Sequence, residues 1–203
     1  MKQSVVESFY AWSKQFEGEV SWMYLDIKGL VTTGIGNLID PCPQALVLPW
    51  QEPGGSLAGS ARIRSVWNAV KSHKECASKG CHYAQQFCPL RLSPDAIAVL
   101  VQKKLAANWT FMGKQYPKIF GAAEEWPAKA QLATSGMAWA VGAGMPGIFK
   151  QWAQHAAAQD WIGCSQTCSI STRNNPGIVP RNAAQRVLFE AAATESVEEH
   201  DRV

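Results

Sequence analysis

The chain has 203 residues, of which 47% are hydrophobic and 17% charged, enough apolar material for one sizeable core that can divide into two lobes. Its formal net charge of +3 is only mildly basic, and Lys103-Lys104 is the single adjacent basic pair, so nucleic-acid binding is not expected. Polar residues interrupt the most apolar run, residues 128–147, and residues 1–20 lack the pattern of a signal peptide, so no membrane insertion or leader is predicted.

The first predicted element is a helix that ends near Glu17. Gly18 is typical of a helix end. Glu17 would then lie where the unpaired carbonyls of the helix oppose ionisation, and partial burial would add to this effect. We therefore expect Glu17 to act as a proton donor at neutral pH. The apolar residues of the helix recur at the spacing of one face: Val5, Phe9, Trp12 and Phe16.

A β-hairpin is predicted after this helix. Apolar, β-branched and aromatic residues run from Met23 to the turn signal at residues 26–29, and they resume from Leu30 to Thr32. Asp26 would lie near the turn and Thr32 on the return strand, so that both face back toward Glu17. The three side chains would then place an acid, a base and a hydroxyl around one cleft. The alternative is that they are ordinary surface residues.

The rest of the chain is predicted to be loop and helix. Prolines and glycines break up residues 41–55, and the charged residues 194–203 are expected to form a flexible tail. Helices are predicted at residues 61–73, from Pro94 after a Ser93 cap, from Pro127, and around Phe149, Trp152 and Trp161.

Six cysteines are many for a cytosolic enzyme of this length. Their even number permits disulfides in an oxidising compartment, and we favour this interpretation over free thiols. A zinc site formed by the cysteines of residues 76–88 with His82 is a third alternative, although no Cys-x-x-Cys pair is present. The six are Cys42, Cys76, Cys81, Cys88, Cys164 and Cys168.

The segment from Glu17 to Leu38 resembles the catalytic signature of the phage-type lysozymes, the muramidase endolysins of tailed bacteriophages. In that family a Glu-Gly follows the first helix, an Asp lies nine residues after the Glu, and a Thr lies six residues later. A Gly-x-Gly and a Leu come next. The matching residues here are Glu17-Gly18, Asp26, Thr32, Gly34-Ile35-Gly36 and Leu38, whereas Asn37 stands where many relatives carry a His.

Two further segments are similar to the same family. Residues 174–189 resemble its C-terminal arginine-bearing loop and helix, and residues 137–144 resemble its central helix, with Ala140 in place of a polar residue. The resemblance covers residues 3–39 and 91–190. Residues 40–90, which contain cysteines, have no counterpart in it and are interpreted as an insertion.

The resemblance implies a single α+β domain of lysozyme-like fold, with a small β-hairpin lobe, a larger, mostly helical lobe and a cleft between them. It implies a glycoside hydrolase that cleaves the β-1,4 bond between N-acetylmuramic acid and N-acetylglucosamine in peptidoglycan. Glu17 would be the general acid, and Asp26 and Thr32 would position the attacking water. No cofactor or metal is expected. Most of the nine tryptophans should be core, but the substrate-binding candidates are Leu38, Trp139 and Trp152.

Three functional alternatives follow. The first is a phage endolysin, made in the cytoplasm and released to the cell wall through a holin-formed lesion. The second is an antibacterial effector, which a secretion system delivers to a rival's periplasm and which an immunity protein neutralises. The third is a catalytically silent wall-binding module of the same fold. In each case peptidoglycan is the expected partner, and the protein is expected to be a monomer.

Overall fold

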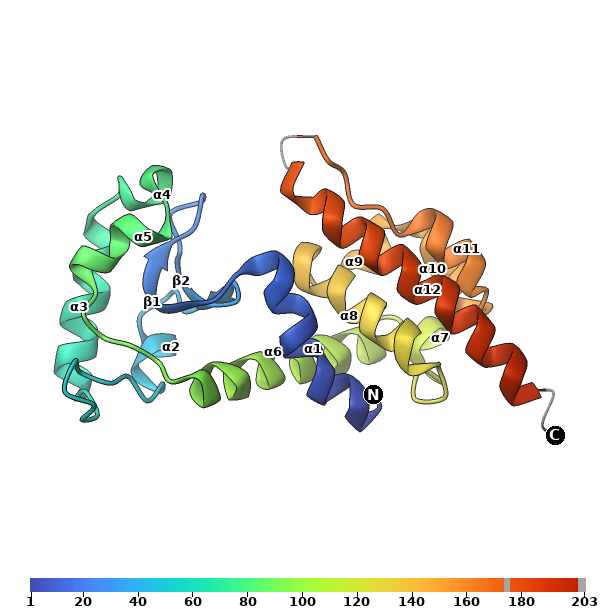
Figure 1. Ribbon diagram of the computed structural model, residues 1–203, viewed down its shortest axis with the longest axis horizontal. Helices are drawn as coiled ribbons and strands as arrows, with labels where there is room; N and C mark the ends of the chain where they lie inside the picture. Colours follow the sequence, from blue (N-terminus) through green and yellow to red (C-terminus); the bar gives the residue numbers. More distant parts are fainter. Residues whose placement is uncertain (174–175, 201–203) are drawn as a thin grey trace. The chain divides into compact units, whose positions relative to one another are not determined.

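The computed structural model describes residues 1–173 and 176–200, and the chain forms two compact units. One unit consists of Met1–Phe16 and Lys104–Val203, and the other of Glu17–Lys103. Most elements are helices, and the strands form one small antiparallel sheet (Figure 1). The predicted α+β class agrees with this mixture of elements.

The sheet lies in the unit Glu17–Lys103 and has three strands in the order β1-β2-β3. The strands are β1 (Val20–Leu25), β2 (Val31–Gly34) and β3 (Asn37–Leu38). Gly29, with φ +73°, ends the first turn, and Gly36, with φ +83°, lies in the second. Both angles are in the left-handed region, which glycine adopts without steric cost. The predicted hairpin is therefore confirmed, and a short third strand extends it.

Helices from the region of residues 40–90 pack around this sheet (Figure 1). The helix α3 contacts β1 and β2, and α4 and α5 contact β1. The buried positions of α3 are Ile63, Val66, Trp67 and Val70, the face that the helical spacing predicts. The elements after the sheet are α2 (Pro43–Leu46), α3 (Ser60–Ser72), α4 (Cys76–Lys79), α5 (Cys81–Ala84), the 3₁₀ turn η1 (Gln85–Phe87) and α6 (Pro94–Gln115).

The other unit is a helical bundle with an aromatic core. The helix α12 packs against α8 and α11. Trp126 and Trp161 meet edge to face, with 5.1 Å between their ring centroids, an arrangement that aromatic pairs prefer. Besides parts of α1 (Gln3–Glu17) and α6, the unit contains α7 (Pro117–Phe120), α8 (Ala128–Val141), α9 (Met145–Ile148), α10 (Lys150–Ala157), α11 (Trp161–Thr167), the 3₁₀ turn η2 (Pro176–Ile178) and α12 (Val179–His200).

The C-terminal segment differs from its prediction. A flexible tail was expected from Thr194, but α12 continues to His200. Phe189 and Ala192 are buried, and Lys129 Nζ of α8 lies 2.8 Å from Glu195 Oε1. The Lys129–Glu195 ion pair joins α12 to α8 one residue beyond Thr194. Residues 174–175 of the predicted loop and 201–203 of the predicted tail lie outside the described residues.

All six cysteines are free thiols in the structure. Five are buried and Cys81 is half-buried. Burial raises the pKa of Cys76, Cys88, Cys164 and Cys168, so these thiols stay protonated at neutral pH. The structure thus has the free thiols that were the second interpretation of the sequence. Within residues 1–173 and 176–200, no helix is both long and apolar enough to cross a membrane.

The start of α11 offers a test of the helical unit. Asp160 Oδ1 accepts a hydrogen bond from Gly163 N at 2.8 Å, and Oδ2 lies 2.8 Å from His155 Nδ1. These contacts hold the pKa of Asp160 below its ordinary value of 3.8, the Gly163 bond more than the His155 bond. The cap therefore stabilises the fold above that value, and its contribution is lost as the pH falls through the lower pKa of the folded state.

We expect Asp160→Ala to lower the free energy of unfolding by about 1 kcal/mol at neutral pH, because the helix loses its N-cap acceptor. The loss should be smaller at an acidic pH well below 3.8, because the native carboxyl becomes protonated as the pH falls through its lowered pKa. Urea unfolding of both proteins at the two pH values measures this. Asp160→Asn is the control, since an amide oxygen can cap but does not titrate in this range. An equal loss at both pH values would contradict the prediction.

Candidate active site

Glu17 is the last residue of α1, and Gly18, with φ +68°, ends the helix there. The predicted helix end is confirmed. The partial burial predicted for Glu17 is wrong, because its side chain is exposed and the adjacent Gly18 lies at the surface as well. Glu17 is also the first residue of the unit that contains the sheet, so it shares that unit with Asp26, Thr32 and Leu38.

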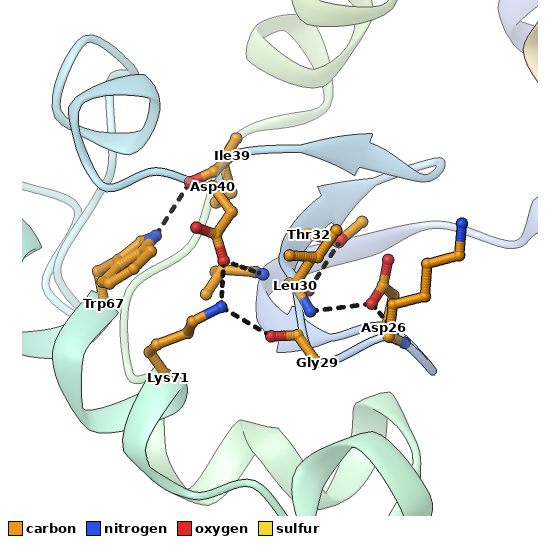
Figure 2. Close-up of polar contacts among 10 residues, drawn as sticks. Asp26, Gly29, Leu30, Thr32, Ile39, Asp40, Trp67 and Lys71 are labelled. Atoms are coloured by element: carbon orange, nitrogen blue, oxygen red, sulfur yellow. Dashed lines mark hydrogen bonds and ion pairs between the residues drawn. The ribbon is translucent and has the colours of Figure 1, made fainter. Parts of the chain in front are cut away.

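The Asp26 side chain accepts hydrogen bonds from backbone amides of the first turn of the sheet (Figure 2). Asp26 Oδ1 accepts hydrogen bonds from Lys28 N at 2.8 Å and from Leu30 N at 2.9 Å. The backbone amide of Asp26 donates to Leu30 O at 2.9 Å. Such an Asx turn fixes the carboxylate plane relative to the strands. Among the described residues, no donor occupies the second carboxylate oxygen, Oδ2.

Thr32 is attached to the same residue, Leu30 (Figure 2). Its Oγ1 donates a hydrogen bond to Leu30 O at 3.2 Å, and the residue is only 5% exposed. The amide of Leu30 thus holds Asp26, and the carbonyl of Leu30 holds Thr32. Because the Thr32 proton is used within the strand, Oγ1 can act toward a water molecule as an acceptor. A carboxylate oxygen is an acceptor, so Asp26 Oδ2 offers a second one.

Three side chains form one row across the sheet. Tyr24 pairs with Thr32, and Thr32 pairs with Leu38. Directly paired residues of antiparallel strands project from the same face, so Thr32 lies between an aromatic and an aliphatic neighbour. Leu38 is 45% exposed, which leaves an apolar surface beside Thr32. Tyr24 was not predicted as a site residue, although the register of the hairpin places it opposite Thr32.

The pKa of Tyr24 is raised by its surroundings, which include the charges of Glu17 and Asp26. Burial, followed in order of size by the negative charges of Cys81, Glu17 and Asp26, raises the pKa of Tyr24 to about 12. Tyr24 is therefore a neutral hydroxyl across the physiological pH range. Glu17 and Asp26 thus both contribute to the electrostatic environment of this one side chain.

Asn37, the departure from the lysozyme signature, makes a local contact. It is buried, and its Oδ1 accepts a hydrogen bond from Ile35 N at 3.3 Å. A Cβ atom on Gly34 would lie 2.8 Å from this oxygen and 3.3 Å from Ile97 Cγ2. The Gly-x-Gly of the signature is therefore needed at Gly34 both for its φ of +64° and for space.

Trp139 and Trp152 lie in the helical unit, and their burial contradicts the prediction that they bind substrate. Trp152 is 0% exposed inside the aromatic core of the helical unit. Trp139 is 6% exposed, with Phe9 at 5.1 Å between ring centroids and Lys104 Nζ at 3.9 Å from its ring. Neither indole presents a free face on which a sugar ring can stack. Of the three predicted substrate contacts, only Leu38 is exposed.

The described residues contain no group of three His, Cys, Asp or Glu side chains placed to hold a metal ion. The site consists instead of carboxylates, hydroxyls and an apolar surface on a short sheet. Such a set can donate a proton, accept a proton and orient a water molecule.

A substitution at Gly34 tests whether the lack of space beside this residue limits the stability of the fold. Gly34→Ala is expected to lower the free energy of unfolding by about 1–2 kcal/mol for the positive φ, and by about 1 kcal/mol more for the contact with buried Asn37. Gly29→Ala is the matched control, because Gly29 also has a positive φ but nothing lies within 4 Å of its Cβ position. Chemical unfolding compares the two variants. Equal losses would show that the space beside Asn37 is not limiting.

Neither a protein-family model nor a curated protein matches the chain. The functional interpretation therefore depends on the residues and contacts described above.

Proposed function

We propose that the protein is a peptidoglycan muramidase, which hydrolyses the β-1,4 bond between N-acetylmuramic acid and N-acetylglucosamine. The observation that carries this proposal is the attachment of Asp26 and Thr32 to the amide and the carbonyl of one residue, Leu30. The resemblance of residues 17–38 to the phage-type lysozyme signature supplies the substrate class. The protein would act as a phage endolysin or as a delivered antibacterial effector.

The water-activating half of the mechanism uses two acceptors, on Asp26 and Thr32, whose side chains both bind the Leu30 backbone. A water molecule that donates one hydrogen bond to Asp26 Oδ2 and one to Thr32 Oγ1 turns a lone pair away from both. That lone pair attacks the anomeric carbon of the muramic acid residue. Asp26 takes the water's proton as the new C–O bond forms, so it acts as a general base.

Glu17 supplies the other half of the mechanism. As the glycosidic C–O bond breaks, the departing oxygen of N-acetylglucosamine needs a proton, and the Glu17 carboxyl donates it. Glu17 is exposed in the ligand-free protein. A polysaccharide that covers the helix end would exclude water from this carboxyl.

Leu38 and Tyr24 flank Thr32 on the same face of the sheet. The exposed aliphatic side chain suits the apolar C–H face of a sugar ring. The neutral Tyr24 hydroxyl can donate a hydrogen bond near both carboxylates. These two side chains would orient the sugar whose bond is cleaved.

The first test is digestion of purified peptidoglycan, with the products reduced and weighed by mass spectrometry. Wild-type protein should release muropeptides that end in reducible muramic acid. Glu17→Gln and Asp26→Asn should each lower the rate by about 10²–10⁴-fold, since each removes a proton-transfer group. Thr32→Ala should lower it less, because Asp26 still holds the water.

Glu7→Gln is the control for this test, since Glu7 is an exposed residue of the same helix as Glu17. A fully active Glu17→Gln protein would refute the assignment. Intact peptidoglycan to which wild-type and variant proteins both bind would favour the catalytically silent wall-binding module.

The stereochemistry of the product gives a second test. A water activated by Asp26 on the face opposite Glu17 leads to inversion, the outcome for carboxyl groups about 6.5–9.5 Å apart. The newly formed reducing end should therefore be the α anomer before mutarotation, which proton NMR detects early in the reaction. A β anomer would instead indicate that Asp26 acts as a nucleophile and that the enzyme retains configuration.

A further inference from the structure

An ion pair between Asp40 and Lys71 lies beside the turn that carries Asp26 (Figure 2). Asp40 comes shortly after β3, and Lys71 belongs to the last turn of α3. Lys71 Nζ lies 2.5 Å from Asp40 Oδ2. The side chains are 35% and 14% exposed, so water screens this pair less than it screens a surface pair. The hydrogen bonds from Lys71 and Val31 outweigh burial and lower the pKa of Asp40.

Each member of the pair also binds the backbone next to Leu30. Lys71 Nζ donates a hydrogen bond to Gly29 O at 2.8 Å, and Val31 N donates one to Asp40 Oδ2 at 3.1 Å. The Gly29 carbonyl and the Leu30 amide belong to one peptide unit. The Leu30 carbonyl and the Val31 amide belong to the next. The ion pair therefore binds the carbonyl of the first peptide unit, through Lys71, and the amide of the second, through Asp40.

The other ends of the same peptide units bind the candidate catalytic residues. Leu30 N donates to Asp26 Oδ1, and Leu30 O accepts from Thr32 Oγ1. A peptide unit is planar and rigid, so fixing the direction of its carbonyl also fixes the direction of its amide. A hydrogen bond at one end polarises the unit and strengthens the bond at the other. The positions of Lys71 and Asp40 thus affect the positions of the Asp26 and Thr32 side chains.

A second contact from α3 keeps the ion pair in place. Trp67, one helical turn before Lys71, donates a hydrogen bond from Nε1 to Ile39 O at 2.9 Å (Figure 2). Ile39 N in turn donates to Val31 O at 2.9 Å. The helix is therefore attached to the backbone immediately before Asp40 as well as to Asp40 itself. Lys71 cannot shift far without breaking contacts on both sides.

We infer that Lys71, together with Asp40, is a positioning residue for the proposed hydrolysis. Lys71 acts through two peptide units to hold Asp26 and Thr32 where both can bind one water molecule. This inference rests on the proposed muramidase function. It also gives a role to residues 40–90, the region that the resemblance to phage-type lysozymes does not cover.

The test compares three variants in the peptidoglycan assay. Lys71→Met keeps the side-chain length and removes the charge and donors; we expect kcat to fall about 10- to 100-fold, because small displacements of catalytic groups have effects of this size. KM should not change, since the substrate-binding face is intact. Lys71→Arg should recover a large part of kcat. Arg62→Met is the matched control, because Arg62 lies in α3 and pairs with Glu52 at 3.1 Å, away from the turn.

Hydrogen exchange at the Leu30 and Val31 amides provides a readout that is independent of activity. Both amides should exchange faster in Lys71→Met than in Arg62→Met. If Lys71→Met does not fold, Asp40→Asn breaks the same pair from the other side and should also lower kcat.

A Lys71→Met or Asp40→Asn protein with wild-type kcat would overturn the inference and leave the proposed function standing. A fall in kcat that Arg62→Met shares would reflect general instability and would also overturn it. Wild-type protein that does not hydrolyse peptidoglycan would overturn the proposed function and this inference together.

Discussion

The candidate site depends on the hydrogen bonds of the Leu30 backbone. Its amide orients the carboxylate of Asp26, and its carbonyl accepts the Thr32 hydroxyl. The Leu30 side chain takes no part in these bonds, so many residues would serve at this position. What matters is that the turn brings a backbone donor and a backbone acceptor between an Asp and a Thr. A short turn with a left-handed glycine at its end provides this arrangement.

The region of residues 40–90 surrounds the sheet and supplies its outer support. A two-stranded hairpin is at best marginally stable alone, and packing against a helix is one way in which so small a sheet is stabilised. The helix α3 provides that partner with a buried apolar face, an indole hydrogen bond and an ion pair. The buried thiol of Cys88 adds a contact to β1, since Met23 N donates to its sulfur at 3.3 Å. Cys88 therefore packs as a small buried residue rather than in a disulfide.

The helical unit has a different design. Its core cluster combines tryptophans and phenylalanines with alanines, methionines and cysteines, and the aromatic rings bury a large area with few rotatable bonds. Packing in this core accounts for Trp126, Trp152 and Trp161. Arg181, which is 1% exposed, lies with its guanidinium 5.4 Å from the Phe16 ring and donates to Gly136 O. It links α12 to α8 and to the end of α1.

Local features were predictable from the sequence because they depend on neighbouring residues. Periodicity identified the buried face of α3 and, in α1, the buried Val5 and Phe9, whereas Trp12 and Phe16 are only half-buried. Turn residues identified the hairpin that carries Asp26 and Thr32. The exposure of Glu17 and the burial of Trp152 depend on distant packing, which spacing does not encode. The contact of Lys71 with Gly29 joins residues 42 positions apart. Only tertiary structure can bring such a pair together, because no local pattern specifies which distant side chain fills the space beside a turn.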